Sequence, residues 1–81
     1  MIAEHDYAVL TRDLPDLGLA AGDVGVVIHV HRKTGSSEAA GYMLEIFTVD
    51  GQSMDEVSVP ADAVRPANAG DRVSARPVAA E

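Results

Sequence analysis

The clearest strand pattern in the chain is the stretch Val24-Gly25-Val26-Val27-Ile28-His29-Val30-His31. Successive side chains of a β-strand point to opposite faces. The four branched residues Val24, Val26, Ile28 and Val30 therefore share one face, and Gly25, Val27, His29 and His31 share the other. This alternation predicts a half-buried strand. A glycine within it indicates either a bulge or the close approach of another backbone.

Further strand patterns lie on both sides of this stretch. Runs that are rich in β-formers cover residues 7–12, 42–49, about 53–59 and 64–66. Asp50-Gly51 separates the second and third of these runs and is typical of a type I′ hairpin turn. Residues 60–63 begin with proline and predict a single 3₁₀ turn.

Five short antiparallel strands predict an all-β fold, and we expect a small SH3-like barrel. A five-stranded OB-type barrel is the alternative. That fold usually has a helix between its third and fourth strands, and the Asp50-Gly51 hairpin leaves no room for one. The SH3-like barrel is therefore the preferred prediction.

The loop before the clearest strand, residues 13–23, contains Pro15, Gly18 and Gly22. These residues are too closely spaced for a stable helix, because each of them breaks or weakens one. Leucines at positions 14, 17 and 19 make the segment too apolar for a free linker. We expect an ordered loop that folds back and caps one end of the barrel.

The composition of the chain changes at residue 67. From there to residue 81 it is rich in Ala, Gly and Pro, and Val73 and Val78 are the only larger apolar residues. Such a segment can hardly bury enough area to offset the entropy of ordering it. We therefore expect one barrel domain over residues 1–66 and a disordered, flexible tail over residues 67–81.

Four motifs follow one another along the predicted barrel: VLTRDLP at 9–15, GLAAGDVGVV at 18–27, YMLEIFTVDG at 42–51 and VPADAVRP at 59–66. In this order they resemble the short bacterial proteins grouped as domain of unknown function 4926. The resemblance covers residues 5–66 and implies a small SH3-like β-barrel that usually stands alone. It implies little about activity beyond an association with toxin-type or conflict-system neighbours.

The charge balance narrows the class of partner. The 81 residues include 13 acidic and 6 basic side chains, so the formal net charge is −7. Binding to nucleic acid or to an anionic membrane surface needs clustered Lys and Arg, so we expect neither as a partner. Residues 22–30 look like the glycine-centred strand of KOW-type barrels, but they lack the basic residues that accompany that motif.

Residue types and patterns that the sequence lacks exclude further kinds of site and of targeting signal. The chain has no cysteine, which excludes a disulfide, a thiolate zinc site and a cysteine nucleophile. The N-terminus lacks the basic start and the long apolar run of a signal peptide. We expect a cytoplasmic protein of bacterial type.

Side chains that could carry catalysis are few and scattered. Asp55 and Glu56 are adjacent on a predicted strand and point to opposite faces, so they could hardly share a proton. Asp13 and Asp16 are most simply interpreted as solvated charges of a loop. The serines lack a nucleophile elbow, and no glycine-rich phosphate-binding motif is present. We expect neither an enzyme nor a cofactor.

His29 and His31 lie two residues apart and share a face of the clearest strand. Imidazoles at this spacing can bind zinc, nickel or copper if a third ligand joins them. His5, Asp6 or Glu45 could be that ligand. The simpler interpretation is an exposed face opposite the core, so a small metal-binding protein is the less favoured alternative.

Surface recognition is the remaining class of function. A groove for Pro-rich peptides needs a shelf of aromatic side chains, which three aromatic residues supply poorly. We expect a non-catalytic protein-binding module, such as an antitoxin, an immunity protein or an accessory subunit, whose partner is a larger or more basic protein. The residues that we expect to bind this partner are Asp13, Asp16, Leu17 and Glu45. The alternative is a self-assembling structural barrel, a homo-oligomer formed through an edge strand.

Overall fold

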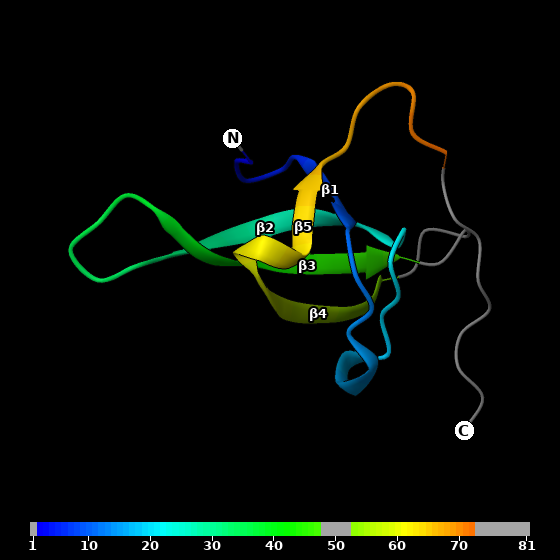
Figure 1. Cartoon of the computed structure of the whole chain (residues 1–81), viewed down its shortest axis with the longest axis horizontal. Helices are drawn as coiled ribbons and strands as arrows, with labels where there is room; N and C mark the ends of the chain where they lie inside the picture. Colours follow the sequence, from blue (N-terminus) through cyan, green and yellow to red (C-terminus); the bar gives the residue numbers. More distant parts are fainter. Residues whose placement is uncertain (1, 48–52, 73–81) are drawn as a thin grey trace.

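The computed structural model of the chain describes residues 2–47 and 53–72. Their elements, in chain order, are β1 (Tyr7–Leu10), η1 (Pro15–Leu17), β2 (Val24–Arg32), β3 (Ala39–Phe47), β4 (Ser53–Pro60), η2 (Ala61–Ala63) and β5 (Val64–Pro66). The strands form one antiparallel sheet in the order β4-β3-β2-β1-β5 (Figure 1). This confirms the predicted all-β fold of five antiparallel strands.

The two outer strands, β4 and β5, are joined by the short 3₁₀ turn η2. No ladder pairs β4 with β5 in the described ranges, so this part of the chain forms an open barrel. The predicted 3₁₀ turn and the short last strand are both present. The predicted Asp50-Gly51 turn lies outside the described residues, although the strands on either side of it pair antiparallel, as a hairpin requires.

The core lies against one face of the sheet and consists almost entirely of aliphatic side chains. Its largest fully buried members are Leu10, Leu44 and Val27, one from each of the three central strands. Ile2, which precedes the first strand, is also buried in this cluster. The remaining members are Ala8, Leu19, Val30, Tyr42, Val57, Val59, Ala63 and Val64.

Strand β2 changes phase along its length. Its register with β3 shifts between Val27 and His29, which marks a β-bulge. Val27 is fully buried before the bulge and Val30 is buried after it, whereas Val26 is only half-buried. The prediction that Val24, Val26, Ile28 and Val30 share one face of the strand is therefore wrong. The extra residue at the bulge reverses the alternation between Val27 and Val30.

Gly25 lies where the predicted close approach of another backbone is found. A Cβ atom at this position would lie 2.9 Å from Ile46 Cδ1, 3.1 Å from Leu44 Cβ and 3.2 Å from the Glu45 carbonyl oxygen. Contacts shorter than about 3.4 Å are tighter than most Cβ atoms show. This glycine lets β3 pass closely over β2, and the bulge follows two residues later.

The loop between β1 and β2 is ordered, as the leucines predict. Leu14 and Leu19 form an isolated bridge in which each N–H donates to the other's carbonyl oxygen, at 2.9 and 3.2 Å. Leu19 is buried in the core and Leu14 packs against it. Leu17, at the end of η1, stays 40% exposed. None of the helical segments in the described ranges has the length and apolarity needed to cross a membrane.

Candidate functional site

The face of the sheet opposite the core carries a row of side chains from four strands. Residues directly opposite each other in an antiparallel ladder point to the same face. Tyr7 on β1 pairs with Val26, Val26 pairs with Glu45, and Glu45 pairs with Glu56 on β4. Tyr7 is 62% exposed, so this row lies on the outer face of the sheet.

A second row on the outer face is centred on Val9, which pairs with Val24 on one side and with Arg65 on the other. Val9 is only 5% exposed, yet it does not belong to the core cluster. Its neighbours Ala8 and Leu10 are the residues of β1 that point into the core. Val9 is therefore buried on the opposite side of the sheet, by groups that cover the outer face.

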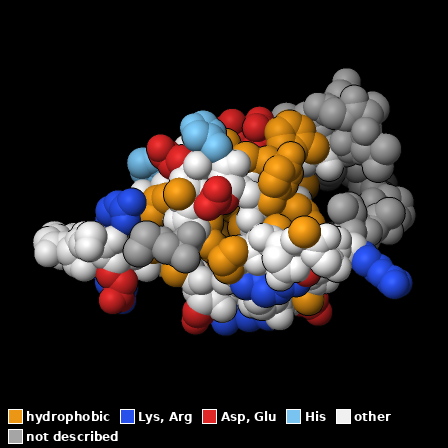
Figure 2. Space-filling view, turned by 90° about the horizontal axis from the view of Figure 1, so that it is seen from above, with side chains coloured by type: hydrophobic (Ala, Val, Ile, Leu, Met, Phe, Trp, Pro, Cys, Tyr) orange, Lys and Arg blue, Asp and Glu red, His pale blue; other side chains and the backbone are white. Residues whose placement is uncertain are grey.

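These rows form the floor of a groove of about 800 Å³. We call its apolar side chains the floor: Tyr7, Val9, Val24 and Phe47. Phe47 is 43% exposed, so two of the three aromatic side chains lie open in or beside the groove, while Tyr42 is buried in the core. A space-filling view shows hydrophobic side chains gathered on one face with acidic side chains beside them (Figure 2).

One wall of the groove is made by residues 66–72, which we call the strap. It contributes Pro66, Ala67, Asn68, Ala69, Asp71 and Arg72 to the lining. The Ala67 N–H donates to the Tyr7 carbonyl oxygen at 3.1 Å, which joins the strap to the start of β1. The prediction of a disordered tail covers residues 67–72 of the strap. In the structure, Ala67 and Asp71 of this segment are hydrogen-bonded to the barrel, and residues 73–81 lie outside the described part.

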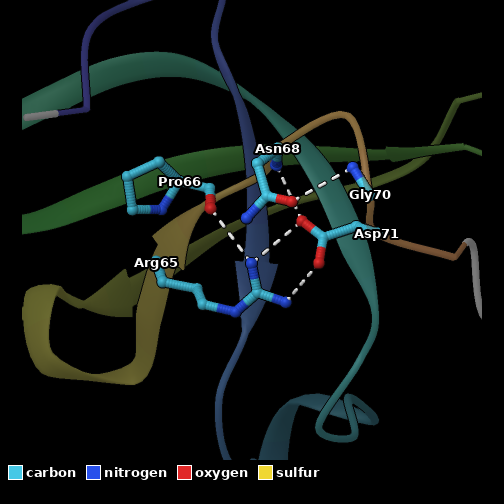
Figure 3. A network of polar contacts seen from close by, with 5 residues as sticks. All are labelled: Arg65, Pro66, Asn68, Gly70 and Asp71. Carbon is cyan, nitrogen blue, oxygen red and sulfur yellow. Dashed lines mark hydrogen bonds and ion pairs between the residues drawn. The ribbon is translucent and has the colours of Figure 1, made fainter.

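A two-pronged ion pair holds the strap (Figure 3). Arg65 donates from Nη1 to Asp71 Oδ2 at 2.9 Å and from Nη2 to Asp71 Oδ1 at 2.7 Å. The same carboxylate accepts the Asn68 N–H at 2.7 Å. Asn68 Oδ1 accepts the Gly70 N–H at 3.2 Å, and Arg65 also donates to the Pro66 carbonyl oxygen at 3.1 Å. Asp71 thus ties the far part of the strap to Arg65 on β5.

The contacts of Asp71 shift the acidity of its carboxyl group. The hydrogen bonds from Arg65, and then the one from the Asn68 backbone, lower the pKa of Asp71 from its ordinary value of 3.8 to about 2. The same contact raises the pKa of Arg65. The carboxylate is therefore charged, and the pair intact, throughout the neutral and mildly acidic range.

We expect the strap to stay closed near neutral pH and to loosen only as pH falls from about 4 toward about 2. A carboxyl whose pKa is lowered on folding adds stability that is present above its unfolded pKa of 3.8 and is lost as pH falls through about 2. Hydrogen exchange of the Ala67 and Asn68 amides, followed by NMR across this range, measures the loss. Asp71→Asn is the control and should show no such transition, and protection that persists unchanged to pH 2 would contradict the expectation.

The two histidines of β2 lie side by side on one face, as predicted. Their ring centroids are 5.0 Å apart in an edge-to-face arrangement. His29 Nδ1 lies 3.8 Å from Glu4 Oε2, and His31 Nε2 lies 3.1 Å from Ser58 Oγ. Within residues 2–47 and 53–72, no group of three or more His, Cys, Asp or Glu side chains is arranged to hold a metal ion. The proposed third ligands, His5, Asp6 and Glu45, therefore do not complete a site there.

The structure separates the four residues predicted to bind a partner. Asp13, Asp16 and Leu17 lie in the loop after β1, whereas Glu45 lies on β3 in the outer row beside Val26. Asp13 Oδ1 accepts the Ala21 N–H at 2.9 Å and so helps to shape the loop. None of the four lines the groove.

The groove residues that the sequence did not single out are Tyr7, Phe47 and Asp71. The sequence shows that aromatic residues are few, but which of them are exposed depends on the strand register. Asp71 has no motif around it, because it lies in a run of small and turn-forming residues. Only its spacing of six residues from Arg65 could have suggested a pair.

The family model described as Domain of unknown function (DUF4926) matches residues 4–66. No curated protein and no solved structure matches the chain. The matched segment includes every residue of the floor and ends where the strap begins.

Proposed function

Since this chain belongs to the family described as Domain of unknown function (DUF4926), whose description names no activity, we propose its function from the groove: it is a non-catalytic protein-binding module. The observation that carries the proposal is the apolar floor on the outer face, where Tyr7 and Phe47 are 62% and 43% exposed. Large apolar side chains left open beside a concave surface are typical of interaction sites. In this proposal the module acts in the cytoplasm of a bacterium.

Acidic groups near the floor indicate the chemistry of the partner. Asp6 lines the groove, and Glu45 and Glu56 lie side by side in the outer row that begins at Tyr7. The whole chain carries a net charge of −7. A complementary partner segment has an apolar anchor for the floor and Lys or Arg beside it. An antitoxin, immunity protein or accessory subunit that covers a basic partner protein fits this description.

Three polar side chains of the groove support binding rather than catalysis, because they are engaged in local structure. Asp6 Oδ2 accepts the Ala3 N–H at 2.9 Å, Asp71 binds Arg65, and Asn68 Oδ1 accepts the Gly70 N–H. Groups held in this way shape the walls of the groove. In this proposal the aromatic and aliphatic floor is the surface that contacts the partner.

Replacing Tyr7 by threonine should weaken partner binding roughly 30-fold or more, because an exposed aromatic at the centre of an interface commonly contributes about 2 kcal/mol or more. Threonine is β-branched and suits the strand, so the fold should persist. The probe is a set of twelve-residue peptides selected from a random displayed library on the wild-type chain. We expect these peptides to share an aromatic or aliphatic residue flanked by Lys or Arg, and calorimetry gives their dissociation constants.

Two matched variants test the loop after β1 as the competing site. Leu17→Thr removes an exposed apolar side chain, and Asp16→Lys reverses an exposed charge, both outside the groove. Peptide affinity should be unchanged in both. Loss of affinity in these variants, with none in Tyr7→Thr, would move the site to the loop. Absence of selected peptides, together with sedimentation of the wild type as a dimer, would favour the homo-oligomer through the outer edge of β4 or β5.

A further inference from the structure

The strap borders an apolar part of the outer face of the sheet, because both line the groove. Val9 points away from the core and is still only 5% exposed. Its cross-strand neighbour Arg65 lies on this side of the sheet. Strap residues between Pro66 and Arg72 line the groove to which Val9 also contributes. The depth of the groove over Val9 therefore depends on where the strap is held.

The strap is held by few bonds, and Asp71 makes the most important ones. Besides the Ala67 N–H bond to the Tyr7 carbonyl oxygen, its position depends on the Arg65–Asp71 pair and on the Asn68 N–H bond to the same carboxylate. The Asp71 side chain is 23% exposed and that of Arg65 is 43% exposed. A two-pronged Arg–carboxylate contact fixes orientation as well as distance.

We propose that the strap is the specificity-determining wall of the groove, and that Asp71 is the positioning residue that holds it in the shape that accepts a partner segment. The inference rests on the proposed function, since it concerns the partner of the same groove. The floor is apolar and can accept many different apolar side chains of a partner. The wall, in contrast, determines how wide a partner segment can lie beside Val9. A wall fixed before binding also lowers the ordering cost of association.

The boundary of the family match supports a division between floor and wall. The floor residues lie within the matched residues 4–66, and residues 67–72 of the strap lie beyond them. Discrimination between partners requires contacts that fit one and exclude another. A wall outside the shared segment can differ between chains while the floor is kept, so it is suited to this task.

Asp71→Asn in the full chain tests the inference, because it keeps the size of the side chain and removes its charge. The probe is the tightest of the twelve-residue peptides selected on the wild-type chain. We expect faster hydrogen exchange at the Ala67 amide and an affinity about tenfold weaker, mostly through faster dissociation. A variant with the two charges exchanged, Arg65→Asp with Asp71→Arg, should regain part of the amide protection at Ala67 and part of the affinity for the peptide.

Asp62→Asn is the matched control. It removes the carboxylate of another exposed Arg–Asp pair, in which Asp62 Oδ1 lies 3.2 Å from Arg12 Nη2, and neither residue lines the groove. It should change neither the exchange at Ala67 nor the affinity for the peptide. Equal losses in both Asp→Asn variants would show a general charge effect and would overturn the inference.

The outcomes separate the inference from the proposed function. Suppose that Asp71→Asn frees the strap and leaves peptide affinity unchanged, while Tyr7→Thr still weakens peptide binding. The wall then has no role in recognition, and this result would overturn the inference but not the proposed function. Unchanged exchange at Ala67 would show that Asp71 does not hold the strap, which also overturns it. If Tyr7→Thr has no effect on any selected peptide, the proposed function falls and the inference falls with it.

Discussion

Leu44→Ala is expected to lower the free energy of unfolding by about 2–5 kcal/mol, enough to leave much of the protein unfolded at room temperature. Leu44 is fully buried in β3, the strand between β2 and β4. Truncation there removes burial and leaves a cavity that neighbours on both sides cannot easily fill. A core of this size rarely supplies more than about 3–5 kcal/mol in total. Urea unfolding followed by circular dichroism measures the change.

Leu17→Ala makes the same chemical change at an exposed position and serves as the control. Leu17 is 40% exposed in η1, so its truncation leaves no closed cavity. The expected loss is within about 0.5 kcal/mol, as for most surface substitutions. Equal losses in the two variants would contradict the placement of Leu44 at the centre of the core.

One short strand, β1, contributes both to the stability of the core and to the groove. On β1, Ala8 and Leu10 point into the core, while Tyr7 and Val9 point to the groove. Alternation along four residues thus assigns every second side chain to a different task. Substitutions at Tyr7 should therefore change binding with little loss of stability, whereas substitutions at Leu10 should act through unfolding.

The positions of the strands along the chain could be predicted from sequence, because each strand has a local signal. The alternation from Val24 onward, the proline before η2 and the Asp-Gly between two β-rich runs each have a short-range cause. The phase of β2 could not be predicted, since the bulge between Val27 and His29 is created by pairing with β3. Ile28 suits either side of a strand and gives no sign of the change.

The groove was harder to predict than the sheet, because its parts come from distant positions. Tyr7 and Phe47 come together only through the register of β1, β2 and β3. Asp71 acts through Arg65 within a segment whose composition predicts a tail. The predicted roles of Asp16 and Glu45 in binding stay predictions, and Asp13 has a structural contact with Ala21 that any test must consider.

Gly41→Ala should destabilise the protein by about 1–3 kcal/mol, because an added methyl group has no space between β3 and β4. A Cβ atom at Gly41 would lie 2.6 Å from the Val59 carbonyl oxygen, which is backbone and cannot rotate away. Gly41 pairs with Pro60, next to Val59, so the two strands would have to separate. For a domain of this size each kcal/mol lowers the melting temperature by roughly 4–8 °C, which a thermal melt resolves.

Gly70→Ala is the matched control for this last variant. The nearest atom to an added Cβ there is Asn68 Oδ1 at 3.6 Å, an ordinary contact, so the melting temperature should stay close to that of the wild type. The pair also separates fold from function. Gly41 does not line the groove, so any loss of peptide affinity in Gly41→Ala should follow the fraction of unfolded protein and disappear on cooling. Affinity that falls in fully folded Gly41→Ala would mean that the β3–β4 contact, and not the outer face of β1, shapes the binding surface.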